Sequence, residues 1–365
     1  MKATISRDDL LTLLTSVSRY GTTKTILDIL KFGLLKAKEG KISISATDLE
    51  TETTAIIPAI IEAEGEILVP IKRIYDLCKS LPDVNIKLSL TENHKLKLNW
   101  GNNATIAILD TTDFPAITAF DENDSDIISI STESLKEVLP QVTFAAATDE
   151  SRPVLAGVYL TTNMLQSADG YRASFVKFHT LGDIIIPAVA LDGFYKLLCG
   201  NQVNIQNSDK KAIFQLEDGT VFTSNSIQGE FPDTKAILSH ETDADLKLTF
   251  DTKQLLSVLK QAEVFSDERV GLLVVAASEN GFDIRIKSDD NEFQANIPAI
   301  KTEGHSEIKF GISLKYLSGS KEGVLPRVTS EFVKICLSGN GSNPIVLKSG
   351  DFTHIIMPME IRKRG

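Results

Sequence analysis

The spacing of apolar residues predicts three similar helices at widely separated places in the chain. In each, a residue able to accept hydrogen bonds from a helix start precedes a Leu by four positions, and apolar residues follow three and four positions later. This is a helix N-cap followed by an apolar stripe on one face. The segments are ISRDDLLTLLTSV, ISTESLKEVLPQV and FDTKQLLSVLKQA, with Ser6, Ser131 and Asp251 as caps. Helices are therefore predicted over 6–19, 132–142 and 251–263.

A second helix follows an apolar strand in each third of the chain. EILVPIKRIYDLCKSL and DIIIPAVALDGFYKLL both read as strand, proline, amphipathic helix, with Pro70 and Pro187 at the boundary. Proline is tolerated there because the first N–H of a helix has no intrahelical partner. The third segment, EIKFGISLKYLSG, has Gly311 in place of the proline. These segments predict helices over 71–80, 188–198 and 313–321.

Alternation of apolar and polar residues predicts strands between the helices. Strands are expected within 32–48, 157–169 and 272–290 after each first helix, and within 84–100, 210–225 and 332–349 after each second helix. Glu39-Gly40, Asp218-Gly219 and Asn280-Gly281 are predicted to reverse the chain as hairpin turns.

Other markers recur with the same spacing. Asp48 and Asp169 are 121 positions apart, and Asp289 lies 120 positions further on. We therefore expect three repeated domains, over 1–122, 123–243 and 244–365, joined by short acidic connectors near 120–126 and 239–245. Two helices on antiparallel sheets in each domain give an α+β fold.

Composition limits the class of protein. With 42% hydrophobic and 24% charged residues, the chain is typical of a soluble globular protein. It contains no apolar run of about 20 residues and no apolar N-terminal signal segment, so no membrane association is expected. Cys78, Cys199 and Cys336 are far apart and form no metal-binding spacing. Reduced thiols and a cytoplasmic location are therefore expected.

Residues arranged for catalysis are not found. The five histidines occur singly, at 94, 179, 240, 305 and 354, and there is no phosphate-binding glycine loop or nucleophile motif. We therefore predict no catalytic residue, no metal site and no cofactor, and interpret the chain as a binding protein rather than an enzyme.

The charge pattern leaves room for one kind of nucleic-acid contact. A formal charge of −11 argues against a simple basic nucleic-acid binder. The six predicted helices nevertheless hold more basic than acidic residues, so a surface formed by them could be basic while the rest of the chain is acidic.

The octapeptide SADGYRAS, residues 167–174, is the clearest candidate for a binding surface. An Asp occupies this place in all three repeats, so Asp169 is expected to belong to the architecture of a turn. Gly170, Tyr171 and Arg172 have no counterpart in the other copies, which favours a function for them.

Together, the motifs ATDLET, SADGYRAS, QGEFPDTKAIL and IIMPME, in this order and spacing, resemble the bacterial DNA polymerase III beta subunits, the sliding clamps. The likeness covers nearly the whole chain. It implies half of a six-domain ring, closed as a head-to-tail homodimer. It further implies that the ring encircles double-stranded DNA without sequence preference, slides along it and acts as a polymerase processivity factor. The implied partners are the replicative DNA polymerase, the clamp loader and repair proteins, each bound through a short peptide motif.

The resemblance places an apolar peptide-binding pocket between the second and third domains, with Tyr171 and Arg172 as its polar rim. Its wall is expected to comprise Leu155, Gly170, Tyr171, Arg172, Pro232, Ile237, Ile355, Met357, Pro358 and Met359. Ala168, Tyr171 and Ala173 replace a usual Thr, His and Leu, which suggests a pocket that is wider on one side.

The resemblance also assigns DNA-facing and dimer residues. Basic residues on helices and loops are expected to face the DNA: Lys24, Lys72, Lys79, Lys136, Arg152, Lys196, Lys253, Lys260, Lys315 and Lys321. The dimer contact is expected to join Val264 and Phe265 of one copy to Ile106 and Arg73 of the other.

Two other interpretations stay open at this point. One is an enzyme or ligand-binding protein built from duplicated α+β domains, which would need convergent titratable residues in one pocket. The other is a clamp-like ring that serves a different set of partners.

Overall fold

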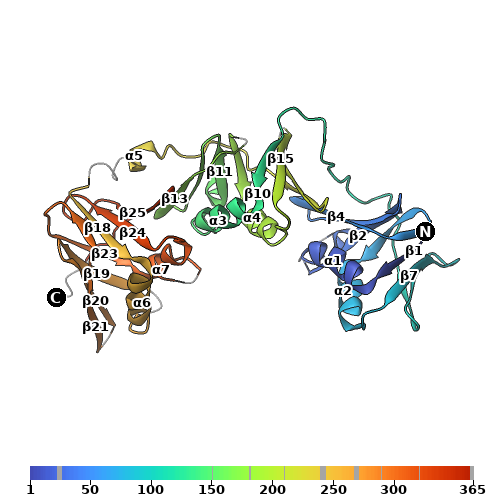
Figure 1. Cartoon of the computed structure of the whole chain (residues 1–365), viewed down its shortest axis with the longest axis horizontal. Coiled ribbons are helices and arrows are strands. Elements are labelled where there is room, and N and C mark those ends of the chain that lie inside the picture. The colour runs from blue at the N-terminus through green and yellow to red at the C-terminus, as the bar shows by residue number, and fades with distance from the viewer. Residues whose placement is uncertain are drawn as a thin grey trace. The chain divides into compact units, whose positions relative to one another are not determined.

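In the computed structural model, the described residues are 1–22, 27–149, 151–180, 182–208, 210–238, 244–266, 271–288, 290–319 and 321–361. They form two compact units: Met1–Glu133 with Gly193–Ser226, and Ser134–Asp192 with Ile227–Gly365. The three predicted domain boundaries stay a prediction. Each unit contains two antiparallel sheets (Figure 1).

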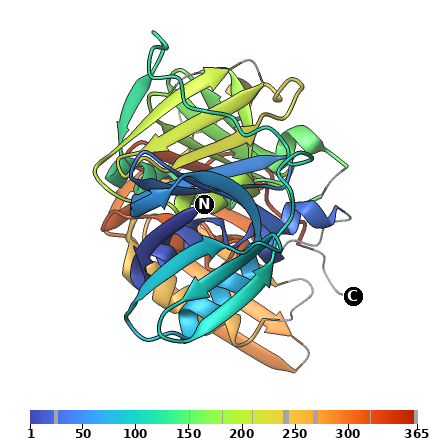
Figure 2. The ribbon, with the colours of Figure 1, turned by 90° about the vertical axis from the view of Figure 1, so that its right-hand side faces the viewer.

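The first unit contains a five-stranded sheet in the order β5-β1-β7-β8-β9. Its blue to cyan strands face the viewer in Figure 2. The bounds are β1 (Lys2–Ser6), β5 (Ile60–Ala63), β7 (Asn85–Leu90), β8 (Lys95–Asn99) and β9 (Asn103–Ala107).

The second sheet of this unit has eight strands in the order β10-β15-β16-β17-β4-β3-β2-β6. It joins strands of the first and second repeats, because β17 pairs with β4. The bounds are β2 (Phe32–Lys38), β3 (Lys41–Thr47), β4 (Thr51–Pro58), β6 (Gly65–Pro70), β10 (Ile128–Ser131), β15 (Gln202–Ser208), β16 (Lys211–Leu216) and β17 (Val221–Asn225).

The second unit has a nine-stranded sheet, in the order β14-β11-β12-β13-β26-β25-β24-β18-β22, and a four-stranded sheet, β21-β20-β19-β23. The nine strands are β11 (Gly157–Thr161), β12 (Met164–Ala168), β13 (Arg172–Lys177), β14 (Ile184–Pro187), β18 (Leu246–Asp251), β22 (Lys301–Glu303), β24 (Phe332–Leu337), β25 (Ile345–Ser349) and β26 (Phe352–Ile356). The smaller sheet comprises β19 (Leu272–Ser278), β20 (Gly281–Ser288), β21 (Asn291–Pro298) and β23 (Ile308–Ser313).

The first helix of each repeat lies where its apolar stripe predicts. These helices are α1 (Arg7–Val17), α3 (Thr132–Thr143) and α6 (Thr252–Glu263). The Ser6 and Asp251 side chains accept hydrogen bonds from the backbone N–H of Asp9 and Gln254, which confirms both caps. Leu10, Leu13 and Leu14 of α1 are buried in the core of the first unit.

The second helices agree less closely with the prediction. α2 (Ile71–Ser80) has the predicted bounds and lies beside α1 (Figure 1). α4 (Ala188–Tyr195) ends early, because the N–H groups of Leu197 and Leu198 bond to carbonyls only three residues back. α7 (Leu314–Leu317) is a single turn, so the prediction of 313–321 was wrong. Ser318 and Gly319 follow it, and glycine is a poor helix former.

Two local predictions also need correction. Gly311 lies inside β23, so Ser313 is the residue at the strand–helix boundary where Pro70 stands in the first repeat. The turn between β19 and β20 consists of Glu279 and Asn280, since Ser278 pairs with Gly281. The remaining short segments are α5 (Lys235–Leu238), η1 (Tyr20–Thr22), η2 (Asp28–Lys31), η3 (Pro153–Ala156) and η5 (Leu325–Arg327).

Candidate peptide-binding site

The pairing of β13 with β26 brings two distant segments of the predicted pocket together. Arg172 lies opposite Ile356, and Ala173 lies opposite Ile355. Beyond the ladder, the N–H of Met357 donates to the Tyr171 carbonyl over 2.8 Å. The turn before β13 and the segment after β26 therefore lie side by side.

Asp169 shapes the turn before β13. Its Oδ1 accepts hydrogen bonds from the backbone N–H groups of Tyr171 and Arg172, at 2.9 and 3.0 Å. Gly170 has φ +92°, a conformation that side chains with a Cβ rarely adopt. The turn leaves the Tyr171 side chain 66% exposed. This confirms the architectural role predicted for Asp169.

An apolar cluster forms the floor beside this turn. Its buried members are Ala173, Phe175, Cys336, Val346 and Ile355, from β13, β24, β25 and β26. Partly buried apolar residues pack against them, namely Met164, Ala168, Ile237, Leu238 and Ala244. Two predicted pocket residues, Ile237 and Ile355, are thus in one cluster.

The segment that carries Ile237 is fastened to the sheet. The hydroxyl of Thr234 donates to Gln166 Oε1 over 2.7 Å, and both side chains are buried. The N–H of Ile237 then bonds to the Thr234 carbonyl over 3.1 Å, which starts α5. Pro232, earlier in this segment, is exposed.

The chain after β26 provides the pliable part of the site. Met357 is 43% exposed, whereas Pro358 and Met359 are half-buried. The N–H of Met359 donates to the Gly311 carbonyl over 2.8 Å. A Cβ on Gly311 would lie 2.7 Å from the Met359 carbonyl oxygen, so glycine permits this close approach. Leu155, in η3, is buried.

Arg172 does not form the polar rim that was expected. It is only 7% exposed, and its guanidinium bonds to Asp169 and to two backbone carbonyls. Arg172 is the first residue of β13, and its side chain points into the protein rather than to the surface. Tyr171 alone of this pair is exposed.

Sequence reasoning missed His354, which lies beneath the site on β26. Its Nδ1 is 2.7 Å from the Ser174 hydroxyl, and its ring stacks on Phe144 with centroids 5.1 Å apart. Burial, and to a smaller degree the charge of Arg172, hold the pKa of His354 well below its usual value. No pattern in the sequence pointed to His354. Its neighbour Phe144, however, could have been identified from the repeat, because Phe144 occupies the position that Arg19 occupies in the first repeat.

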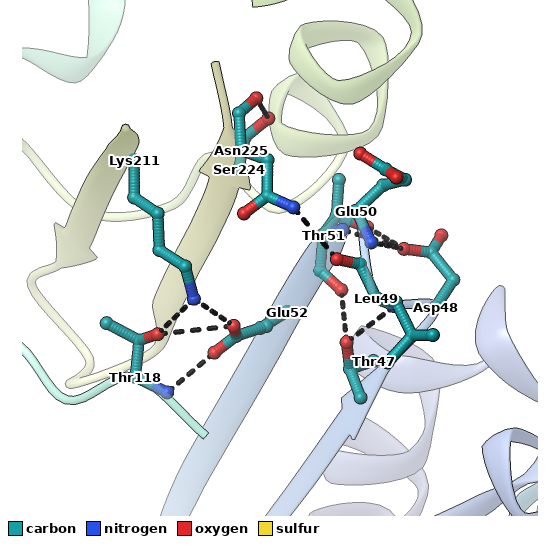
Figure 3. Close-up of polar contacts among 10 residues, drawn as sticks. All are labelled: Thr47, Asp48, Leu49, Glu50, Thr51, Glu52, Thr118, Lys211, Ser224 and Asn225. Carbon is teal, nitrogen blue, oxygen red and sulfur yellow. Dashed lines mark hydrogen bonds and ion pairs between the residues drawn. The ribbon is translucent and has the colours of Figure 1, made fainter. Parts of the chain in front are cut away.

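The equivalent junction of the first and second repeats has a polar floor instead (Figure 3). Asp48 accepts from the N–H groups of Glu50 and Thr51, and the Asn225 N–H donates to the Glu50 carbonyl, as Met357 does to Tyr171. Glu52, however, stands at the place of Ala173. It accepts hydrogen bonds from Lys211 and Thr118.

The predicted DNA-facing residues have accessible side chains. Except for Lys24, which lies outside the described residues, all of them are exposed. Two form ion pairs: Lys72 with Asp76 at 3.1 Å, and Lys315 with Glu322 at 3.2 Å. Lys79 lies over the Tyr75 ring, 5.3 Å from its centroid.

The residues predicted for the dimer contact differ in exposure. Val264 is 81% exposed, and Phe265 beside it stacks on Phe293 of β21. Arg73 is exposed. Ile106 is 5% exposed and packs into the core of the first unit, so it offers little surface to a partner.

Within the described parts of the chain, no group of three or more His, Cys, Asp or Glu residues is arranged to hold a metal ion. None of the described helices is long and apolar enough to cross a membrane.

Known proteins resemble this chain along nearly its full length. Sequence models of the N-terminal and central domains of the DNA polymerase III beta subunit match residues 1–118 and 129–233. The beta sliding clamp of Vibrio cholerae is 26% identical over 99% of this chain and 100% of its own. That of Staphylococcus aureus is also 26% identical, over 98% of this chain and 99% of its own.

Solved structures share the fold. The sliding clamp of Bacillus subtilis matches with a TM-score of 0.91 at 22% identity, over 99% of this chain and 100% of its own. The beta subunit of Streptococcus pyogenes matches with a TM-score of 0.89 at 21% identity, with the same coverage. Repeats, fold and sequence models agree: this chain belongs to the DNA polymerase III beta subunit family, the beta sliding clamps.

Proposed function

We propose that two copies of this chain close head to tail into a ring around duplex DNA, and that the ring tethers a DNA polymerase through the apolar site beside Tyr171. The single observation that carries the proposal is which edge strands of the repeats are paired within one chain and which are not. Each repeat presents the same two edges, and only some of them are paired within one chain.

Two junctions inside the chain use these edges. β17 of the second repeat pairs with β4 of the first, and β26 of the third repeat pairs with β13 of the second. By the same rule, β9 of the first repeat should pair with β21 of the third. Among the described residues, β9 and β21 are instead the last strands of their own sheets. Open edges of this kind favour pairing with another chain.

A second copy satisfies both open edges at once. If β9 of each copy pairs with β21 of the other, two identical contacts form and the assembly closes with neither β9 nor β21 left unpaired. The exposed Val264 supports this arrangement, since it follows α6 as Arg19 follows α1 and Phe144 follows α3. In the two internal junctions, these residues pack beside the turn that precedes the paired strand.

DNA binding in this proposal is electrostatic and independent of sequence. The exposed lysines of α2, α3 and α6 can contact phosphates and exchange them through water, which permits sliding. The proposed action is tethering, and no bond is made or broken.

The apolar site is proposed to take short segments of polymerase, clamp-loader and repair proteins. Unbranched Met357 and Met359 can adapt to different apolar side chains. The small side chains of Ala168 and Ala173 favour bulkier residues in the ligand. The clamps of Pseudomonas aeruginosa and Bartonella birtlesii have been solved bound to griselimycin, which supplies a probe.

The dimer is tested by Val264→Asp. The substitution puts a charge into the proposed contact, where it would lose water without gaining a partner, so we expect the dissociation constant of the dimer to rise by about tenfold or more. Native mass spectrometry reads the outcome: wild-type chain at twice 39.9 kDa, and the variant mainly at 39.9 kDa.

Val189→Asp is the matched control. Val189 is 76% exposed on α4, away from β9 and β21 in the chain, so the same change should leave the dimer intact. A wild-type protein that stays monomeric at micromolar concentration, or two variants with equal effect, would contradict the proposed seam.

A further inference from the structure

Arg172 is tied to its surroundings through all three nitrogens of its guanidinium group. Nε donates to Asp169 Oδ2 over 2.8 Å, one Nη donates to the Phe144 carbonyl over 2.8 Å, and the other donates to the Glu322 carbonyl. The side chain of Arg172 is 5% exposed. A planar guanidinium presents its donors in a fixed fork, so these bonds define one orientation.

Two aromatic rings flank the same group. The guanidinium carbon lies 4.7 Å from the centroid of Tyr316 and 5.4 Å from that of Phe144. Such cation–π contacts further restrict the side chain. Phe144 belongs to the second repeat, whereas Tyr316 and Glu322 belong to the third. Arg172 therefore fastens the turn of residues 169–172 to both repeats.

The first repeat has a comparable arrangement built from a different part of the sequence. Arg19, after α1, places its guanidinium 3.1 Å from Thr51 Oγ1 and 3.6 Å from Asp48 Oδ2, and lies over the Tyr20 ring at 5.0 Å. The turn beside it has a polar floor and no proposed peptide. A guanidinium beside the turn aspartate thus recurs at a junction for which no peptide is proposed.

We propose that Arg172 is a positioning residue: it fixes the turn that presents Tyr171 and Met357 to the ligand, and it makes no contact with the ligand itself. The inference rests on the proposed peptide site. Asp169 links the two roles, because one of its oxygens holds the N–H groups of Tyr171 and Arg172 and the other holds the Arg172 side chain.

Pre-organisation explains why this matters for binding. A turn that is ordered before the ligand arrives loses less conformational entropy on binding. Without the three hydrogen bonds of the Arg172 guanidinium, Tyr171 and the Met357 backbone bonded to it would sample several arrangements. The affinity for the ligand would then fall, although the apolar floor of the site is intact.

The test compares Arg172→Lys with Arg327→Lys. Lysine keeps the charge but cannot make the three-way fork. Arg327 also packs against Phe144, with its guanidinium carbon 5.6 Å from the ring centroid, but it lies in η5 rather than in the turn of residues 169–172, so it is the matched control. Griselimycin affinity is measured by calorimetry, and amide hydrogen exchange of the unliganded protein is followed at Tyr171 and Met357, with Phe175 and Ile355 as references within the strands.

For Arg172→Lys we expect griselimycin affinity to fall by about tenfold or more, the fold-change expected for losing a charge-assisted hydrogen bond. Exchange should quicken at Tyr171 and Met357 but not at Phe175 and Ile355. Arg327→Lys should change neither quantity. Asp169→Asn, which keeps Arg172 but weakens its anchor, should act in the same direction and serves if Arg172→Lys folds poorly.

Two results would overturn the inference. One is unchanged exchange at the turn with reduced affinity, because Arg172 would then contact the ligand directly. The other is unchanged affinity together with unchanged exchange. Failure of the wild-type protein to bind griselimycin would instead count against the proposed peptide site, and the exchange comparison would still decide whether Arg172 orders the turn.

Discussion

His354 shows how a single buried side chain constrains the site. It is fully buried on β26 between Phe144 and Phe352, with ring centroids at 5.1 and 6.2 Å, and Ser174 lies at its Nδ1. Arg172 is the charged group that lowers its pKa further, after burial. Protonated His354 would place a positive charge in apolar surroundings and close to the Arg172 guanidinium.

This predicts a loss of stability in mild acid. In the unfolded chain His354 titrates near pH 6.5, whereas in the folded protein its pKa is well below that value. Below about pH 6.5 the unfolded state binds the proton and the folded state does not. The free energy of unfolding should therefore fall by up to about 1.4 kcal/mol per pH unit from this residue, and should not change through it above pH 7.

Chemical unfolding at about pH 7 and pH 5 measures this effect. His354→Asn keeps a polar atom near Ser174 but does not titrate, so its stability should fall less between the two pH values. His305→Asn, at an exposed site, is the control and should behave as wild type. An equal fall in wild type and His354→Asn would contradict the assignment.

At this scale the sequence was informative about backbone and less so about side chains. The recurrence of Asp48 and Asp169 predicted the turn, because an aspartate that caps its own turn acts locally. The inward direction of Arg172 could not be predicted, since its partners Phe144, Tyr316 and Glu322 are distant in sequence. The burial of Ile106 was missed for the same reason.

At the scale of elements, the junction of β4 and β17 depends on a small polar network (Figure 3). Glu52 Oε1 accepts from Lys211 Nζ at 2.7 Å, and Oε2 accepts from the Thr118 N–H at 2.6 Å. Lys211 also donates to the Thr118 hydroxyl at 2.7 Å. The network fastens the segment that carries Thr118 to β4 and to β16, the strands on either side of β17.

Glu52→Ala should therefore destabilise this junction. It removes the acceptor of the Thr118 N–H and one of the two oxygens to which Lys211 donates, and we expect the free energy of unfolding to fall by about 2 kcal/mol. Glu50→Ala is the control, because Glu50 is exposed two residues away and should cost less than about 0.5 kcal/mol. Equal effects in denaturant titrations would mean that the network does not hold the junction.

The elements themselves were predictable to different degrees. Helices with a cap and an apolar stripe, such as α1 and α6, were predicted closely because both signals are local. The length of α7 was overestimated. The helix was predicted to run to Lys321, but it ends at Leu317, before Ser318 and Gly319. β5 and β22 were not predicted individually, because short edge strands depend on a neighbour that supplies hydrogen bonds.

At the scale of the whole molecule, the repeat explains both the junctions that form within the chain and the strand edges that stay unpaired. Three copies of one pattern produce two internal junctions and leave β9 and β21 as the edges for a third. The second junction has an apolar floor where the first has Glu52 and Lys211. One chain is therefore expected to offer one peptide site of this kind, and a dimeric ring two.

Topological linkage to DNA tests the central proposal most directly. The protein is placed on a nicked circular plasmid by the clamp loader of the same organism, isolated by gel filtration, and the plasmid is then cut once at a site distant from the nick. If two copies encircle the duplex and slide, they should stay on the closed circle and leave within minutes after cutting. Retention on the linear DNA at the level seen on the circle would contradict a sliding ring.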